Sequence, residues 1–249
     1  MYKHNYPLKK NYLTFREQKA LSTLEHSEII RTSEAHTYLK QANETLSQLV
    51  KKGHFIRLKK GLLISKEAFL QRPYEVVSKA MKGVVSYISA LHLHGILEYE
   101  PNVIYIQVES RPFETSIGKY TIKATTTTHK FGLVQQEGIF VTDTEKTLLD
   151  CLSHPTRAGG YTVIARALKE SKLNWKRLLE YLELFDKGSL YQKLGYLLTK
   201  TGKKTPRYVL RELKTHVKNN CRLVSDTSTS YTYNTEWKIM DNTGVKEWN

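Results

Sequence analysis

The hydrophobic and polar positions between residues 43 and 65, NETLSQLVKKGHFIRLKKGLLIS, predict a helix followed by a β-hairpin. Apolar residues recur every three to four positions over Glu44–Lys52, which is the period of an amphipathic helix. Asn43 is a favoured N-cap residue, and Gly53 suits the left-handed position that follows a helix. Two apolar runs, Phe55–Leu58 and Leu62–Ile64, then predict strands joined by a tight turn at Lys59-Lys60-Gly61.

The residues before this segment predict the rest of a winged helix-turn-helix domain. The expected elements are a helix begun by the capping box Thr14–Glu17, a strand at Ile29-Ile30, a helix capped by Thr32 or Ser33 and ending near Leu39, and the turn Lys40-Gln41-Ala42. Glu44–Lys52 then becomes the recognition helix and the hairpin becomes the wing. Amphipathic helices and hairpins are also common in other proteins, so the interpretation depends on the order of the elements.

A second, larger domain is expected after Gln71-Arg72-Pro73, which breaks the pattern. We predict an α+β chain: a winged helix-turn-helix domain over 1–72, and over 73–249 a mixed α/β domain with a small sheet and several helices. The expected strands are 103–108, 120–126 and 139–141; the expected helices are 74–81, 86–94, 161–170, 175–184, 190–199 and 206–219. Thr142–Glu145 reads as a second capping box, before the helix EKTLLDCL. The polar segment SDTSTSYTYNTEWKIMDN could return as β-structure.

The composition favours a basic, intracellular protein. Lys and Arg number 39 against 24 Asp and Glu, a formal net charge of +15, which favours polyanionic partners, although ribosomal and membrane-surface proteins share this bias. The two cysteines, Cys151 and Cys221, form no CxxC pair, so neither a zinc site nor a disulfide framework is indicated. No apolar run approaches the roughly 18 residues of a membrane span. We therefore expect a soluble protein in a reducing cytoplasm, without membrane contact and without a cofactor.

Three patterns that could carry catalysis or metal binding are better explained by structural roles. His92 and His94 would point about 200° apart on a helix and have no acidic or cysteine ligand nearby in sequence. The charges of Asp143, Glu145, Lys146 and Asp150 are explained by the capping box and the helix dipole. Glu236-Trp237-Lys238, ten residues after Asp226, resembles a metal-dependent nuclease pattern, but the same spacing occurs at Glu17-Gln18-Lys19 and at Glu212-Leu213-Lys214.

Two basic surfaces are the stronger candidates for function. On the recognition helix and the wing, the residues expected to contact DNA are Thr45, Ser47, Gln48, Lys51, Lys52, Lys59 and Lys60. On the last predicted helix, Arg207, Arg211, Lys214 and Lys218 form a basic stripe, and Lys204 nearby adds to this surface. Such a stripe can follow a phosphate backbone, or it can be a solvated face that keeps the protein soluble.

The chain resembles the AbiEi-type antitoxins of type IV (abortive infection) toxin–antitoxin systems over nearly its whole length. The resemblance rests on TLSQLVKKGHFIRLKKGLLIS, YISALHLHGI, GIFVTDTEKTLLDCLSHP and LGYLLTK. The family often ends its wing with a glycine, one residue and a tyrosine, where this chain has Gly61-Leu62-Leu63. The resemblance implies a winged-helix autorepressor that binds inverted repeats in its own promoter. It also implies a C-terminal domain that neutralises a nucleotidyltransferase toxin without a stable complex, although some relatives could modify the toxin.

The sequence thus favours a DNA-binding antitoxin and transcriptional autorepressor with no catalytic activity, whose partner is double-stranded DNA. The alternative is a metal-dependent nuclease or toxin-modifying enzyme with a winged-helix domain. An RNA-binding protein is disfavoured because no aromatic-rich RNP-like strand occurs.

Overall fold

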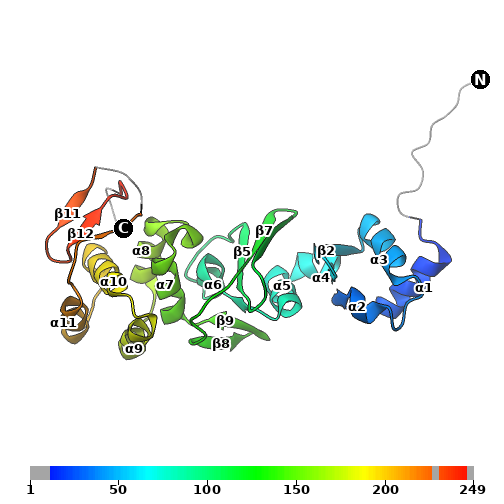
Figure 1. The fold of residues 1–249 in the computed structure, drawn as a ribbon, viewed down its shortest axis with the longest axis horizontal. Helices are drawn as coiled ribbons and strands as arrows, with labels where there is room; N and C mark the ends of the chain where they lie inside the picture. The colour runs from blue at the N-terminus through cyan, green and yellow to red at the C-terminus, as the bar shows by residue number, and fades with distance from the viewer. Residues whose placement is uncertain (1–11, 226–229, 246–249) are drawn as a thin grey trace, which may run out of the picture. The chain divides into compact units, whose positions relative to one another are not determined.

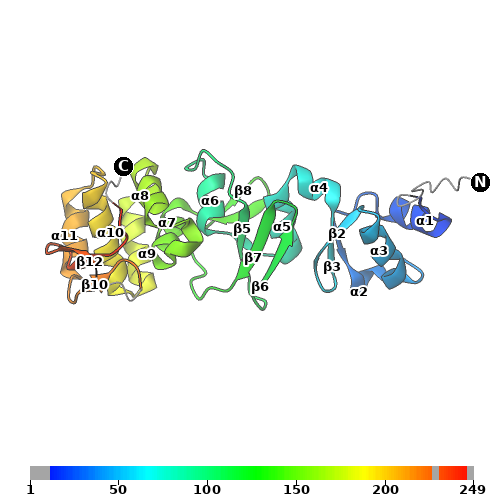
Figure 2. The ribbon, with the colours of Figure 1, turned by 90° about the horizontal axis from the view of Figure 1, so that it is seen from above.

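The computed structural model describes residues 12–225 and 230–245 and shows a mixed α/β protein. The chain divides into two compact units, Met1–Lys82 and Gly83–Asn249. Within the described residues the strands form three sheets, one in the N-terminal unit and two in the C-terminal unit (Figures 1 and 2). Each unit is described separately below.

The N-terminal unit packs five helices around a three-stranded antiparallel sheet of order β1-β3-β2. Its elements are α1 (Phe15–Leu24), β1 (Ile29–Arg31), α2 (Thr32–Ala35), α3 (Ala42–Lys51), β2 (Phe55–Lys59), β3 (Leu62–Ser65), α4 (Lys66–Gln71) and α5 (Pro73–Met81). Inward residues of α1, α3 and the sheet form one core, which includes Leu24, Ile30, Leu46, Leu49 and Phe55. This core holds α3 against the sheet by burial of apolar surface.

Two local signals near α1 and α3 act as the sequence predicts. The Thr14 hydroxyl accepts a hydrogen bond from the Glu17 amide at 3.3 Å, and the Glu17 carboxylate accepts one from the Thr14 amide at 2.6 Å, so the capping box is confirmed. Gly53 has φ +80°, the left-handed conformation expected after α3. These two residues fix where α1 begins and where α3 leads into β2.

The predicted starts of α2 and α3 are wrong in detail. Asn43 is not the N-cap of α3, because the helix begins two residues earlier and is preceded by Gln41 in the left-handed conformation, with φ +50°. α2 is only one turn long, with Arg31 rather than Thr32 or Ser33 at its N-cap position, and it ends before Leu39. Because α2 ends at Ala35, the connection to α3 spans residues 36–41 and is longer than the predicted turn Lys40-Gln41-Ala42, and the left-handed Gln41 directs the chain into α3.

The division between the units falls after Lys82, ten residues beyond the boundary expected at Arg72-Pro73. Pro73 occupies the first turn of α5, where a missing amide hydrogen costs nothing. Two contacts then join α5 to the N-terminal sheet region: Arg31 donates a hydrogen bond to the Ala80 carbonyl at 3.3 Å, and Arg72 pairs with Glu28. The proline therefore starts a helix of the first unit and does not begin a second domain.

The C-terminal unit contains a six-stranded sheet, a group of helices and a second, smaller sheet. Its elements are β4 (Val84–Val85), α6 (Tyr87–Leu93), β5 (Val103–Gln107), β6 (Phe113–Ile117), β7 (Tyr120–Thr125), β8 (Leu133–Gln136), β9 (Ile139–Thr142), α7 (Thr144–Ser153), the 3-10 helix η1 (Pro155–Ala158), α8 (Tyr161–Glu170), α9 (Trp175–Phe185), α10 (Gly188–Lys200), α11 (Arg207–Thr215), β10 (Cys221–Arg222), β11 (Thr232–Asn234) and β12 (Ile239–Asp241).

The six-stranded sheet has the order β6-β7-β5-β4-β9-β8. β5 pairs with β7 and β4 with β9 in parallel, and the other neighbours are antiparallel. β6 and β8 are therefore the edge strands. Helices α6 to α11 share one core with Tyr105 of β5, and α7 lies in its middle, with Leu148, Leu149 and Leu152 fully buried.

The smaller sheet, of order β10-β12-β11, confirms that the C-terminal segment returns as β-structure within the described residues. Trp237, between β11 and β12, is fully buried, and its ring nitrogen donates a hydrogen bond to Thr199 of α10 at 3.1 Å. A Cβ atom at Gly195 would lie 2.1 Å from the Trp237 ring. Gly195 therefore provides the notch in α10 that admits this ring.

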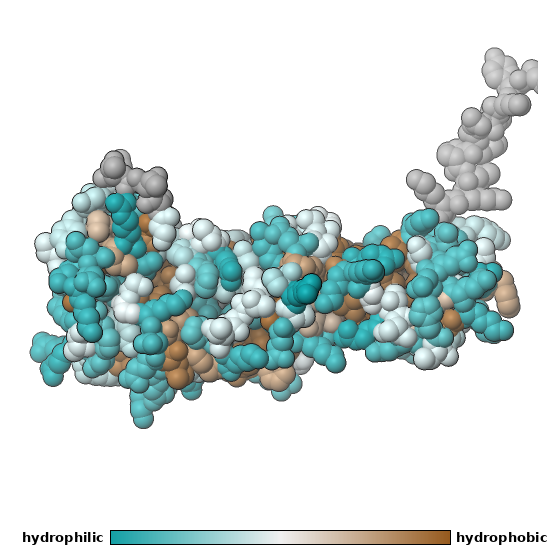
Figure 3. Space-filling model, viewed as in Figure 1, coloured by the Kyte–Doolittle hydropathy of each residue, from teal (hydrophilic) through white to brown (hydrophobic). Residues whose placement is uncertain are grey.

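Most of the surface visible in Figure 3 is hydrophilic in both units. Within the residues described, none of the helices has the length and apolar character that crossing a bilayer requires.

Candidate nucleic-acid interface

α3 presents a polar side to solvent while its other side is built into the core. Ala42, Thr45, Leu46 and Leu49 are buried, whereas Lys51 is exposed. Ser47 and Gln48 are partly exposed between these two sides. The accessible groups of α3 are thus a hydroxyl, an amide and an ammonium, which together can bond base edges and phosphates.

Thr45 does not belong to this accessible surface. Its side chain is 2% exposed, and its hydroxyl has no hydrogen-bond partner among the described residues. The physical reason is helical phase: Thr45 lies one turn from both Ala42 and Leu49, which are core residues. This burial disfavours the predicted contact between Thr45 and DNA in this conformation of α3.

Lys52, also predicted to contact DNA, is engaged by other residues of the N-terminal unit, which disfavours that contact. Its ammonium lies 2.6 Å from the Glu17 carboxylate and donates a second hydrogen bond, also 2.6 Å, to the Tyr12 carbonyl. The lysine side chain is only 16% exposed. The hydrogen bond from Lys52, together with that from the Thr14 amide, lowers the pKa of Glu17 to about 2. Lys52 therefore ties the end of α3 to the start of α1.

The hairpin of β2 and β3 carries three basic side chains of differing accessibility. Lys60, in the turn, is exposed, and Lys59 is partly buried on β2. Arg57 is exposed on the same strand and was not among the predicted contacts. The register of β2 against β3 shifts between Arg57 and Lys59, because the buried Leu58 is an extra residue in the strand. Arg57 stands between the apolar residues Ile56 and Leu58 of the predicted strand, and this alternation could have identified it as an outward-facing basic residue of the hairpin.

The basic stripe of α11 is shorter than predicted. Lys204, Arg207 and Arg211 are exposed, but the helix ends at Thr215, so Lys218 lies beyond it. Lys214 is in an ion pair with Glu236 at 2.6 Å. His216 is the C-cap of α11, and its ring stacks on the Tyr191 ring with the ring centres 3.8 Å apart. Lys218 therefore lies outside the helix that carries the stripe, and Lys214 has a carboxylate partner beside it. Exposed Tyr208 lies beside the remaining arginines and was not predicted.

The acidic and basic residues of the EKTLLDCL helix form a closed network instead of an open site. Lys146 is fully buried, and its ammonium lies 2.6 Å from both carboxylate oxygens of Asp150. Gln107 donates a further hydrogen bond to Asp150 at 3.0 Å, and the rings of Phe131 and Phe185 lie 5.4 and 5.1 Å from the ammonium. Burial raises the pKa of Asp150, and the contacts with Lys146 oppose that shift.

The capping box expected at Thr142–Glu145 is absent. Asp143 is the N-cap of α7 and accepts a hydrogen bond from the Lys146 amide at 2.8 Å. Thr142 is buried, where its hydroxyl lies 2.7 Å from that of Thr147. Glu145 instead accepts a hydrogen bond from the Asn174 amide, so it fixes the start of α9. The sequence motif therefore positions elements of the core.

The residues considered for metal binding do not converge in the part of the chain that the structure describes. No group of three or more His, Cys, Asp or Glu residues there could hold an ion. His94 bonds the Thr142 carbonyl at 2.7 Å, Glu236 pairs with Lys214, and Lys238 donates to the Lys218 carbonyl. Asp226, the remaining member of the nuclease pattern, lies outside the described residues.

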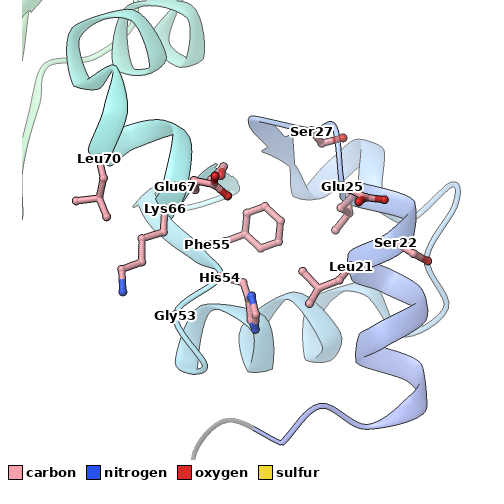
Figure 4. Close-up of a pocket in the computed structure, with 12 residues that line it drawn as sticks. Leu21, Ser22, Glu25, Ser27, Gly53, His54, Phe55, Lys66, Glu67 and Leu70 are labelled. Carbon is pink, nitrogen blue, oxygen red and sulfur yellow. The ribbon is translucent and has the colours of Figure 1, made fainter.

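A pocket of about 560 Å³ in the N-terminal unit differs in character from the basic surfaces. It lies between α1, the start of β2 and α4, with the Phe55 ring between the carboxylates of Glu25 and Glu67 (Figure 4). Leu21 and Leu70 add apolar surface. Its lining carries two carboxylates, Glu25 and Glu67, against one ammonium, that of Lys66, so the balance of charge disfavours the phosphates of a nucleic-acid backbone.

Comparisons with known proteins give one informative likeness. No family model and no curated protein matches the sequence. The crystal structure of the Rv2827c protein from Mycobacterium tuberculosis is similar, with a TM-score of 0.64 and 14% sequence identity over 93% of each chain. At this identity the likeness concerns the fold alone, and it extends across both units.

Proposed function

We propose that the chain is a DNA-binding antitoxin of the AbiEi type. Its N-terminal unit would act as a winged helix-turn-helix domain that binds inverted repeats in its own promoter and represses the operon. Its C-terminal unit would neutralise a nucleotidyltransferase toxin without forming a stable complex. We further propose that it acts in the cytoplasm, without catalytic activity or a cofactor.

The observation that carries the DNA-binding proposal is the arrangement of α3 and the β2–β3 hairpin. α3 follows a one-turn helix and a left-handed turn, and the hairpin follows α3 after a single glycine turn. Accessible Gln48 and Lys51 on α3, with Arg57 and Lys60 on the hairpin, supply one amide and three cations. An amide can bond adenine in two places, and cations can neutralise phosphates.

The antitoxin part of the proposal is supported by the sequence resemblance. The segment GIFVTDTEKTLLDCLSHP spans β9 and α7, and α7 lies within the helical core of the C-terminal unit. Its charged residues are occupied in packing this unit, as described above. The function of this unit would therefore reside on its surface, where Arg207 and Arg211 are exposed.

Binding to promoter DNA and to a scrambled duplex, measured by fluorescence anisotropy over a range of salt concentrations, tests the first part. Lys51→Ala and Lys60→Ala should weaken both duplexes alike and should each reduce the salt slope by about 0.9. Gln48→Ala should narrow the preference for the promoter by about 1–3 kcal/mol. Lys176→Ala on α9 is the control, because it removes the same charge from an exposed helix of the other unit. Equal effects of all three lysine variants would reject the assignment of this surface.

Fragments divided after Lys82 test the second part. Residues 83–249 should protect cells that express the cognate toxin, although they cannot repress the promoter. Residues 1–82 should bind the promoter without protecting. Protection that is lost with Lys51→Ala in the full chain would mean that neutralisation runs through nucleic-acid binding by the N-terminal unit, and this division of roles would then fail.

A further inference from the structure

β8 leaves one edge of the six-stranded sheet open. It is the last strand in the sheet order, and its single neighbour among the described strands is β9. The two strands form a tight hairpin whose turn residues, Glu137 and Gly138, both have positive φ, +49° and +80°. This is a type I′ turn, which matches the twist of the strands it joins.

The hairpin register determines which backbone groups face outward. Gln136 and Ile139 flank the two-residue turn and form a hydrogen-bonded pair, so the next hydrogen-bonded pair is Val134 with Val141. Leu133 and Gln135 lie at the alternate positions, where the amide and the carbonyl of each residue point away from β9. The edge therefore presents two donors and two acceptors.

This edge lacks the features that usually prevent strand association. β8 contains no charged residue and no proline, and its register against β9 is continuous. The opposite edge, β6, is different: Pro112 precedes it, and Glu114, its second residue, pairs with Lys123 at 3.2 Å. The contrast within one sheet marks β8 as the edge that is built to pair.

Apolar side chains also surround the open edge. Leu133, Val134 and Phe140 are 42%, 37% and 54% exposed. Phe140 lies opposite Gln135, so it shares one face of the hairpin with Leu133, whereas Val134 lies on the other face. Both faces of this hairpin thus expose apolar surface beside unpaired backbone groups.

We propose that β8 pairs with β8 of a second copy of this chain, antiparallel about a two-fold axis, to form a continuous sheet. Centring the pair on Val134 places Leu133 opposite Gln135 of the other copy, and all four outward backbone groups of each copy find partners. Four main-chain hydrogen bonds result. The same register brings Phe140 and Leu133 of both copies onto one face as a single apolar cluster, so each copy covers the surface that the other exposes. A strand of another protein would need apolar side chains placed to meet Leu133 and Phe140, whereas a second copy of this chain brings the same residues to the interface through the two-fold symmetry. This pairing is independent of the DNA-binding proposal.

Analytical ultracentrifugation of the full chain tests the pairing over about 5–300 µM, where an interface below the standard size associates. The wild-type chain should form a dimer reversibly. Val134→Lys places two like charges directly opposite each other and should raise the dissociation constant at least tenfold. Gln135→Pro removes one outward amide hydrogen from each copy, which an edge strand tolerates, and should have the same effect. Ser116→Lys, on the exposed side of β6, is the control with the same added charge and should leave the dimer intact.

Far-UV circular dichroism verifies that the variants fold. If Val134→Lys does not fold, the effect of Gln135→Pro on the dissociation constant tests the pairing. A wild-type chain that stays monomeric throughout this range would overturn the proposal. So would a dimer that survives both β8 variants, or one that Ser116→Lys weakens equally.

Discussion

The buried pair of Lys146 and Asp150 gives a quantitative prediction for the stability of the C-terminal unit. The chain contains a matched exposed pair with the same four-residue spacing, Lys176 and Glu180 on α9, 3.9 Å apart with side chains 87% and 57% exposed. The Lys146 and Asp150 side chains are 0% and 4% exposed and 2.6 Å apart. The two pairs differ mainly in their access to water.

Asp150→Asn should leave the Lys146 ammonium enclosed by two aromatic rings without a counter-charge. Removing one partner of a buried pair costs about 3–5 kcal/mol, whereas an exposed pair of this spacing is worth about 0.3–0.5 kcal/mol. A domain of this size loses about 2–4 °C of Tm per kcal/mol, so Asp150→Asn should lower Tm by about 6–20 °C. Glu180→Gln should change it by about 2 °C at most.

Urea unfolding followed by tryptophan fluorescence measures the loss of stability of the C-terminal unit in these variants. All three tryptophans, at positions 175, 237 and 248, belong to the C-terminal unit. Lys146→Met, which keeps the length of the side chain, should also destabilise, because it leaves the Asp150 carboxylate buried. The double variant should recover much of the loss, since it removes both charges.

The pH dependence of Lys146→Met provides an independent measure. Without the lysine, the folded-state pKa of Asp150 should rise well above its unfolded value, so the folded state binds the extra proton. The free energy of unfolding of this variant should then fall as pH rises from about 4 towards 7. If Asp150→Asn costs no more than Glu180→Gln, or if the two single losses simply add in the double variant, the reasoning from burial is refuted.

Three further predictions concern other parts of the chain. The pKa of Glu17 is lowered to about 2, so the stability that its carboxylate contributes is fully present above the unfolded pKa near 4.5 and is lost as pH falls towards 2. Glu17→Gln should therefore reduce the fall of Tm with acid in circular dichroism melts. An unchanged dependence of Tm on pH would contradict the role given to the Lys52 contact. Gly195→Ala forces a methyl group into the Trp237 ring and should cost at least about 1–3 kcal/mol in tryptophan-detected unfolding, whereas a neutral result would mean that the ring can move aside. Arg211→Glu should weaken operator and random DNA by the same factor in gel shifts or impair toxin neutralisation, and an unaltered variant in both assays would leave this part of α11 as a solvated face.

Local patterns predicted much of the N-terminal unit because local rules govern it. The Thr14 capping box and the left-handed Gly53 each depend on residues adjacent in sequence. Thr45 and Lys52 are less accessible than the pattern predicted, because the accessibility of a side chain depends on its tertiary partners. Lys52 finds Glu17 thirty-five residues away, a contact that no periodicity contains. Such contacts determine which side chains of a helix remain accessible to a binding partner and which pack against the rest of the domain.

The C-terminal unit was less predictable for two reasons. β6 and β8 have the sequences FETSI and LVQQ, which are too short and too polar to stand out as strands, and the sheet recruits them through pairing. In α7 the i, i+4 spacing of Lys146 and Asp150 is ordinary for an exposed salt bridge, so the pattern could not distinguish a surface pair from an enclosed one. Burial of that pair depends on Phe131 and Phe185, which come from distant segments.

The insertion of Trp237 into the Gly195 notch affects the order in which the chain can fold during synthesis. Every contact within the N-terminal unit is available once Lys82 has been made, whereas the C-terminal core stays incomplete until the ribosome has passed Trp237 and β12. At about 5–20 residues per second, synthesis of this interval takes roughly 8–30 s. α10 is complete at Lys200, so its notch stays unfilled only over the last part of this interval, roughly 2–8 s. Chains truncated before residue 237 should expose the same apolar surface permanently and be removed by proteases.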